Sequence, residues 1–246
     1  MKLSAFIAVS ALLILIPSVI FTAEMGESGG YDLDSLLEKA EKDFELSEND
    51  AVFLLKRKNV EVTPSGDLKS TIHTVVRIAT RSSIRSYADL RVPYNSATSS
   101  FKTIKLRTWN DGRWWPDSEE ISETAVVHTT PAAVASASDY ASMREVMLLH
   151  DGVELPCVME TEYQIIERGG AGKMPGGFEI FPQNDPAMVV EYSVTLPAGR
   201  DLKFSSGNGA PPPEQERSDG RKKYIWKMER VNRLGSPRID NRSSYA

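Results

Sequence analysis

The chain has 246 residues, a formal net charge of −5, and 41% hydrophobic and 26% charged residues. This composition is too apolar for a disordered protein, and the length suits one large β-domain or two small ones. Positive and negative residues are interspersed, and the sequence has no basic patch of the kind that binds the phosphates of a nucleic acid. We therefore expect no nucleic-acid partner. The single cysteine excludes an internal disulfide, so stability has to come from a packed core.

Residues 1–23 have the order of a secretory leader, with Lys2 followed by a nearly unbroken apolar run as far as Ile16. Cleavage at the end of this segment would place Phe21 where a small residue is preferred. A membrane anchor over residues 3–21 that is never cleaved is therefore the alternative, and the only membrane contact we expect. Both interpretations predict an exported protein, located in the periplasm or at the cell surface.

Residues 24–46 are predicted to form a glycine-containing spacer and then a short amphipathic helix. The apolar residues of this helix recur at intervals of one helical turn: Leu33, Leu36, Leu37, Ala40 and Phe44. A helix of this length is marginal alone in water, so we expect it to pack on a larger body.

From residue 50 onward the apolar pattern changes to a period of two, which is typical of strands with one solvated face. The alternation is clearest in four segments: 70–80, 158–166, 187–196 and 223–228. Turn signals separate the strands and no long helix intervenes, which predicts an all-β antiparallel sandwich over residues 47–235. Residues 236–246 are predicted to be a tail.

Two stretches break the alternation. Residues 125–142 are rich in Ala, Ser and Thr, and we expect a long connection with weak local structure. Residues 205–220 contain Gly and three consecutive prolines, which favours a flexible hairpin loop.

Cys157 and His150 lie seven residues apart, and a Cys/His pair is one way to make a thiol nucleophile. Cys157, however, lies in a turn that leads into a strand, without a helix N-terminus or cation to lower its pKa. We therefore expect a structural cysteine. Metal and cofactor sites are not predicted, because the histidines are scattered and the glycine-rich stretch 169–177 does not open a helix.

His73 with Tyr87, Asp89 and Arg91 could form an acid/base set. The segment from Tyr87 to Arg91 alternates, so these three polar residues are predicted to share one strand face. There they can pair with neighbouring strands, and no nucleophile accompanies them. We favour a structural role for all four residues.

Trp109, Trp114 and Trp115 surround an Asn-Asp-Gly turn, and Tyr94 precedes them by a short interval. Aromatic side chains at a hairpin end can form a platform that binds a sugar or peptide, or they can close the end of a sandwich. We favour packing for most of them. Trp114 and Trp115 are neighbours on a strand and point to opposite faces, so at least one is a candidate for exposure to a ligand.

Several segments, in this order along the chain, are similar to those of one known family: NDAVFLLKRKNVEV, the His-x-Val-Val-Arg-Ile strand at 73–78, YADLRVPYN at 87–95, KLRTWNDGRWW at 105–115, SMREVMLLHDGVELPCVMETEYQI at 142–165, VVEYSVTLPAG and KYIWKMERV. Over residues 31–235 the chain resembles the domain of unknown function 3857, which is usually found ahead of transglutaminase-like domains in exported bacterial proteins. The resemblance implies a β-sandwich-like scaffold. It also implies that catalysis belongs to the downstream domain, before which this chain stops.

The function expected from these observations is that of a noncatalytic exported β-domain, a binding or scaffold module associated with transglutaminase-like proteins. Its expected partners are a transglutaminase-like domain, a peptide or a glycan. One alternative is a subunit that assembles with a separately encoded transglutaminase-like cysteine enzyme. A second alternative is a hydrolase that uses Cys157 or His73. The resemblance supplies no catalytic residues to carry over.

Overall fold

The computed structural model describes residues 30–44, 46, 49–117, 120–169, 179–181, 184–207 and 209–233. The predicted leader and tail lie outside the described residues. The chain divides into two compact units, Met1–Asp32 and Leu33–Ala246, and the account below concerns the second. Within the described residues, no helix has the length and apolar character needed to cross a membrane.

The second unit consists mainly of strands, with short helices between some of them. Its elements in chain order are α1 (Leu33–Phe44), β1 (Ala51–Val62), β2 (Leu68–Ile78), α2 (Arg81–Tyr87), β3 (Asp89–Asn95), β4 (Ser99–Asn110), β5 (Arg113–Trp115), η1 (Glu123–Ala125), β6 (Val126–Thr129), η2 (Ala132–Val134), η3 (Ser138–Tyr140), β7 (Met143–Leu149), β8 (Cys157–Glu167), β9 (Ala187–Pro197), β10 (Glu214–Ser218) and β11 (Arg221–Val231).

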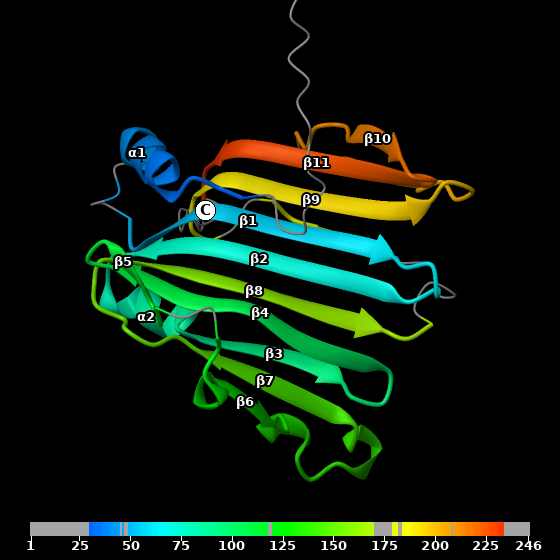
Figure 1. Cartoon of the computed structure of the whole chain (residues 1–246), viewed down its shortest axis with the longest axis horizontal. Helices are drawn as coiled ribbons and strands as arrows, with labels where there is room; N and C mark the ends of the chain where they lie inside the picture. Colours follow the sequence, from blue (N-terminus) through cyan, green and yellow to red (C-terminus); the bar gives the residue numbers. More distant parts are fainter. Residues whose placement is uncertain are drawn as a thin grey trace, which may run out of the picture. The chain divides into compact units, whose positions relative to one another are not determined.

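The strands form two sheets (Figure 1). The large sheet has eight strands in the order β10-β11-β9-β1-β2-β8-β4-β5, and the small sheet has the order β3-β7-β6. Every neighbouring pair is antiparallel except β1 and β9, which run parallel with Val60 beside Val194. The all-β prediction is confirmed. The sequence predicted antiparallel strands only and did not predict the parallel pair. Alternation along a strand indicates which residues share a face, but it does not indicate the direction of the neighbouring strand.

The large sheet has two chemically different faces. Strand pairing places Val76 beside Met159 and Trp226 beside Tyr192, and their side chains belong to the main apolar cluster. We call this side the core face. Side chains alternate along each strand, so His73 and Glu160 point to the opposite side, which we call the ionic face.

The small sheet and α2 pack on the core face. Leu106 of β4 forms a cluster with Val146 and Leu148 of β7, while Ile84 and Tyr87 of α2 pack against the main apolar cluster. Burying these side chains between two layers contributes roughly 1.5–3 kcal/mol for each large residue. The two sheets therefore enclose the core at the β4 side of the molecule.

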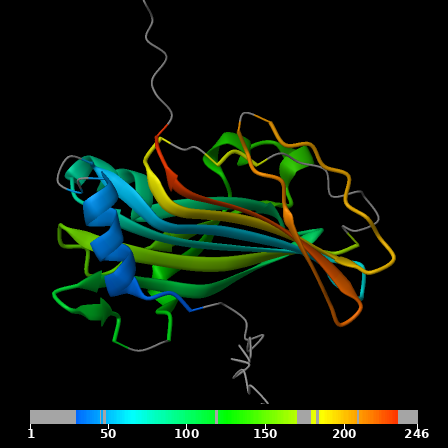
Figure 2. The same cartoon turned by 90° about the horizontal axis from the view of Figure 1, so that it is seen from above.

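Helix α1 lies at the end of the large sheet where β1 begins, and it crosses the strands there (Figures 1 and 2). Its Ala40 is fully buried. On its exposed side, Lys42 and Glu38 are one helical turn apart and form an ion pair of 2.7 Å. The segment after α1 is tied to the ionic face, because the guanidinium of Arg77 donates to the carbonyl of Leu46 over 3.1 Å. The predicted helix and its packing on a larger body are confirmed.

The stretch from residue 73 to 95 contains a helix that the alternation did not indicate. Thr80 has extended backbone angles and its hydroxyl accepts from the amide of Ser83, which makes it the N-cap of α2. Tyr87 is the last residue of α2, and β3 begins at Asp89. The prediction that Tyr87 shares a strand face with Asp89 is therefore wrong.

Two predicted loops also contain strands. Val126–Thr129 pairs with β7 as β6, within the predicted connection 125–142. Glu214–Ser218 pairs with β11 as β10, within the predicted loop 205–220. Both are short edge strands, and every residue of β10 is exposed. Their conformation depends on hydrogen bonds to a partner strand rather than on local propensity, which is why the local pattern missed them.

Candidate functional site

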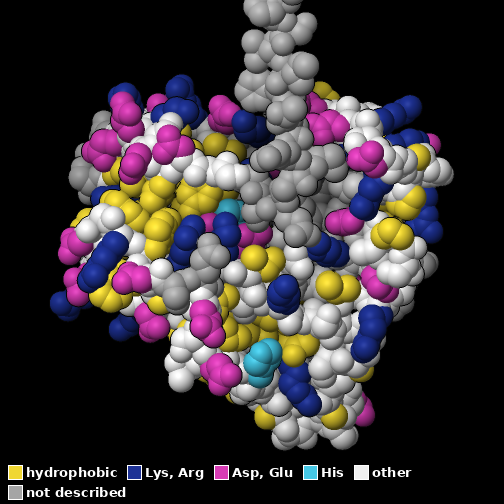
Figure 3. All heavy atoms as spheres, viewed as in Figure 1, with side chains coloured by type: hydrophobic (Ala, Val, Ile, Leu, Met, Phe, Trp, Pro, Cys, Tyr) yellow, Lys and Arg dark blue, Asp and Glu magenta, His cyan; other side chains and the backbone are white. Residues whose placement is uncertain are grey.

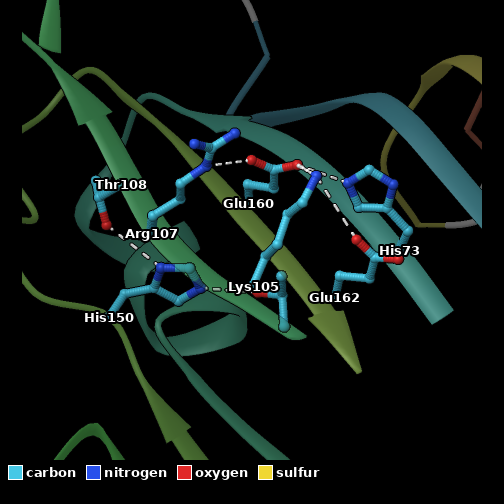
Figure 4. A network of polar contacts seen from close by, with 8 residues as sticks. His73, Lys105, Arg107, Thr108, His150, Glu160 and Glu162 are labelled. Atoms are coloured by element: carbon cyan, nitrogen blue, oxygen red, sulfur yellow. Dashed lines mark hydrogen bonds and ion pairs between the residues drawn. The ribbon is translucent and has the colours of Figure 1, made fainter. Parts of the chain in front are cut away.

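Five ionisable side chains from three adjacent strands meet on the ionic face (Figure 4). They are His73 of β2, Lys105 and Arg107 of β4, and Glu160 and Glu162 of β8. We call this group the ionic cluster. In the space-filling view, basic, acidic and histidine side chains lie together near the centre of the face seen in Figure 1, beside apolar side chains (Figure 3).

A β-bulge in β4 brings the cations to this face. Phe101 lies on the core face, where its ring stacks on Tyr163 with centroids 5.3 Å apart. The register with β8 then shifts between Thr103 and Lys105. The additional residue reverses the side to which later side chains point, so Lys105 and Arg107 lie opposite the two glutamates instead of in the core.

A second bulge acts in the same way on β1. Its register with β2 shifts between Phe53 and Leu55, and Arg57 consequently points to the ionic face. There its Nε lies 3.3 Å from Glu191 of β9. Ion pairs thus continue along the ionic face from β4 to β9.

Glu160 is the centre of the ionic cluster, and its side chain has 0% exposure. One carboxylate oxygen lies 2.8 Å from Nε2 of His73 and 3.4 Å from Nζ of Lys105. The other oxygen accepts from Nε of Arg107 over 2.5 Å. Lys105 also lies 3.7 Å from Glu162, so each cation of the cluster contacts a glutamate.

These contacts determine the ionisation of Glu160. Burial alone would raise its pKa, but the hydrogen bonds from His73 and Arg107 and the charges of Arg107 and Lys105 outweigh burial and lower the pKa to about 2. Glu160 is then an ionised carboxylate and can only accept hydrogen bonds, so Nε2 of His73 carries the proton between them. A general base works best with a pKa near the operating pH. Glu160 is poorly suited to that role and well suited to a fixed ion network.

His150 lies on the other side of the sheet, between two threonines. Its Nε2 is 2.8 Å from the hydroxyl of Thr161 and its Nδ1 is 3.3 Å from the hydroxyl of Thr108. Burial lowers its pKa to about 4. The imidazole is therefore neutral at pH 7 and bridges β4 and β8 as part of the core.

Cys157 is the first residue of β8 and is buried, with 2% exposure. It pairs with Ile78 on the core face, and burial raises the pKa of its thiol to about 11. His73 points to the opposite face. Within the described residues, no hydrogen bond joins Cys157 to His150, whose two ring nitrogens face Thr161 and Thr108 instead.

The structure separates the residues of the predicted acid/base set. His73 contacts Glu160, whereas Tyr87 donates its hydroxyl hydrogen to the carboxylate of Asp185. Arg91 lies 3.2 Å from Asp89 and 3.3 Å from Glu145 of the neighbouring strand β7. The expected pairing of Arg91 across strands is confirmed, and His73 belongs to a different sheet from β3.

The three tryptophans of the β4–β5 hairpin are half-buried, and two of them, Trp114 and Trp115, stack on arginines. The guanidinium of Arg107 lies 4.0 Å from the ring centroid of Trp114, and that of Arg113 lies 3.8 Å from the ring centroid of Trp115. Trp109 pairs with Trp114. Each arginine covers part of one indole face with a cation–π contact, so less of that face is available to a ligand.

Tyr94 is separated from the tryptophans. It lies on β3 of the small sheet, where its ring centroid is 6.0 Å from that of Phe101, and it packs against the smaller apolar cluster. The four aromatic residues proposed from the sequence therefore do not form one platform. A ligand-binding role for the three tryptophans stays a prediction.

Sequence reasoning missed the other members of the ionic cluster, Lys105, Arg107, Glu160 and Glu162. The available signal was the alternation of β8, which placed Glu160 and Glu162 on the polar side of an otherwise apolar strand. Assigning the opposing cations requires the β4–β8 register and its bulge, and neither follows from the two segments separately.

The chain belongs to the DUF3857 family, a domain of unknown function with a solved structure, whose family model matches residues 64–234. This match confirms the resemblance seen in the sequence. The matched region begins after β1 and contains every member of the ionic cluster. No curated protein matched the chain.

Among solved structures, a protein from Parabacteroides distasonis described as a "putative protease" matches with a TM-score of 0.65 and 21% identity. The match covers 75% of this chain and 36% of that chain, and it shows a shared fold. An M1 zinc metallopeptidase from Deinococcus radiodurans matches at 12% identity with a TM-score of 0.32, over 73% of this chain and 39% of that one. The second likeness is too weak to support any inference. The chain thus spans well under half the length of either structure.

Proposed function

We propose that this chain is a noncatalytic exported β-domain that serves as a binding or scaffold module. One observation carries the proposal: Cys157 and His73, the two residues on which the hydrolase alternative rests, point to opposite faces of one sheet. Cys157 pairs with Ile78 on the core face, while His73 contacts Glu160 on the ionic face. A reaction that needs both groups at one atom has no common site here.

The state of each group supports the same proposal. The thiol pKa of Cys157 is raised to about 11 by burial, which keeps the thiolate scarce at pH 7. The carboxylate of Glu160 is held by His73 and by two cations. Groups that satisfy one another in this way stabilise a scaffold, and a substrate would have to displace them.

The likeness to the Parabacteroides protein supports a role within a larger assembly, since this fold covers only 36% of that chain. We propose that the partner is a transglutaminase-like domain or a peptide, as the family resemblance implies, with a glycan as the alternative ligand. The same resemblance and the N-terminal apolar run support export to the periplasm or the cell surface. If the transglutaminase-like partner is a separate polypeptide, this chain would be the subunit that assembles with it.

The noncatalytic part is tested with the full chain and two variants, Cys157→Ser and His73→Gln. The substrates are fluorescein-labelled casein for peptide hydrolysis, and a glutamine peptide with dansylcadaverine for amine transfer. We expect no turnover above the buffer blank with any of the three proteins. Turnover by the parent chain that either variant abolishes would establish the hydrolase alternative and overturn the proposal.

The scaffold part is tested by mixing the tagged full chain with a purified transglutaminase-like domain from a neighbouring reading frame. A complex that co-elutes in gel filtration, and that Cys157→Ser leaves intact, supports the module. Separate elution, together with failure of the chain to retain any member of a displayed random-peptide library, would contradict it.

A further inference from the structure

We draw no further inference here: the strongest candidate, the surface patch beside β11 where the exposed ring of Phe204 packs edge-on against Trp226 with ring centroids 5.4 Å apart, carries nothing because it is an apolar surface and nothing in the structure shows what would cover it.

Discussion

His73 and Glu160 are 87 residues apart in the chain, and their side chains meet over 2.8 Å across two neighbouring strands. The contact is diagonal, because the register places His73 directly beside Glu162. Glu160 therefore lies one pleat away from His73, next to Arg107 of β4. This position allows one carboxylate to receive donors from both adjacent strands, and it makes Glu160 the residue on which the ionic face depends.

The first prediction concerns the charge of Glu160. Glu160→Gln keeps the shape of the side chain but leaves Arg107 and Lys105 without their shared anion, so we expect the free energy of unfolding to fall by roughly 3–5 kcal/mol. Urea unfolding followed by circular dichroism measures the change. The control is Glu38→Gln, which breaks an exposed ion pair on α1 and should leave the urea midpoint unchanged. Equal midpoints for Glu160→Gln and the parent protein would show that the cluster does not stabilise the fold.

The second prediction is an acid-dependent loss of stability that comes from Glu160. Its pKa is about 2 in the folded protein, below its ordinary value of 4.5, so the folded state binds this proton less readily than the unfolded state. The stabilisation is complete above about pH 4.5 and is lost as the pH falls toward 2. Urea midpoints measured across this range should fall more steeply for the parent protein than for Glu160→Gln. Parallel curves would contradict the prediction.

A third prediction separates His150 from Glu160 by its pH window. The pKa of His150 is lowered from 6.5 to about 4, so the unfolded state takes up this proton first as the pH falls. Stability should therefore decrease from about pH 6.5 to about pH 4, on the order of 3 kcal/mol in total. His150→Gln keeps a hydrogen-bonding side chain between Thr108 and Thr161. We expect this variant to be less stable at neutral pH, and its free energy of unfolding should change less between pH 6.5 and pH 4 than that of the parent protein. A slope unchanged by the substitution would assign the effect to other groups.

The fourth prediction is that the Cys157 thiol is unreactive in the native protein. It is buried and its pKa is raised to about 11, so both access and thiolate fraction are low. With 5,5′-dithiobis(2-nitrobenzoic acid) near neutral pH, we expect labelling only after guanidinium is added, with one thiol released per chain. Rapid stoichiometric labelling without denaturant would show that the β8 terminus is open.

The fifth prediction uses two glycines with similar backbone angles. Gly152 has φ of +66°, and a Cβ at this position would lie 2.8 Å from Cγ of Trp115. Gly66 has φ of +86° with no atom within 4 Å of the same position. Both alanine variants strain the backbone, but only Gly152→Ala also displaces the indole, so it should lose about 1–3 kcal/mol more stability than Gly66→Ala. Similar thermal midpoints for the two variants would mean that Trp115 moves aside at little cost.

Much of the fold follows from local patterns. The alternation in β8 assigned Met159 and Tyr163 to one side and Glu160 and Glu162 to the other, and the structure confirms it. The helical spacing of the apolar residues from Leu33 to Phe44 likewise predicted a short helix within residues 24–46, and α1 spans Leu33–Phe44. Helix α2 and the edge strands β6 and β10 were missed, because a cap and a partner strand decide them rather than the period of apolar residues.

By itself the sequence determined which faces are apolar, the approximate positions of most strands, and the family to which the chain belongs, because side-chain alternation is encoded residue by residue. Only the tertiary structure decided which charges meet. The register of β2, β8 and β4, with the bulge near Thr103, selected the partners of Glu160, and the bulge near Phe53 turned Arg57 toward Glu191. A shift of one residue in pairing exchanges the two faces of a strand, and pairing between distant strands depends on the assembled sheet rather than on either segment alone.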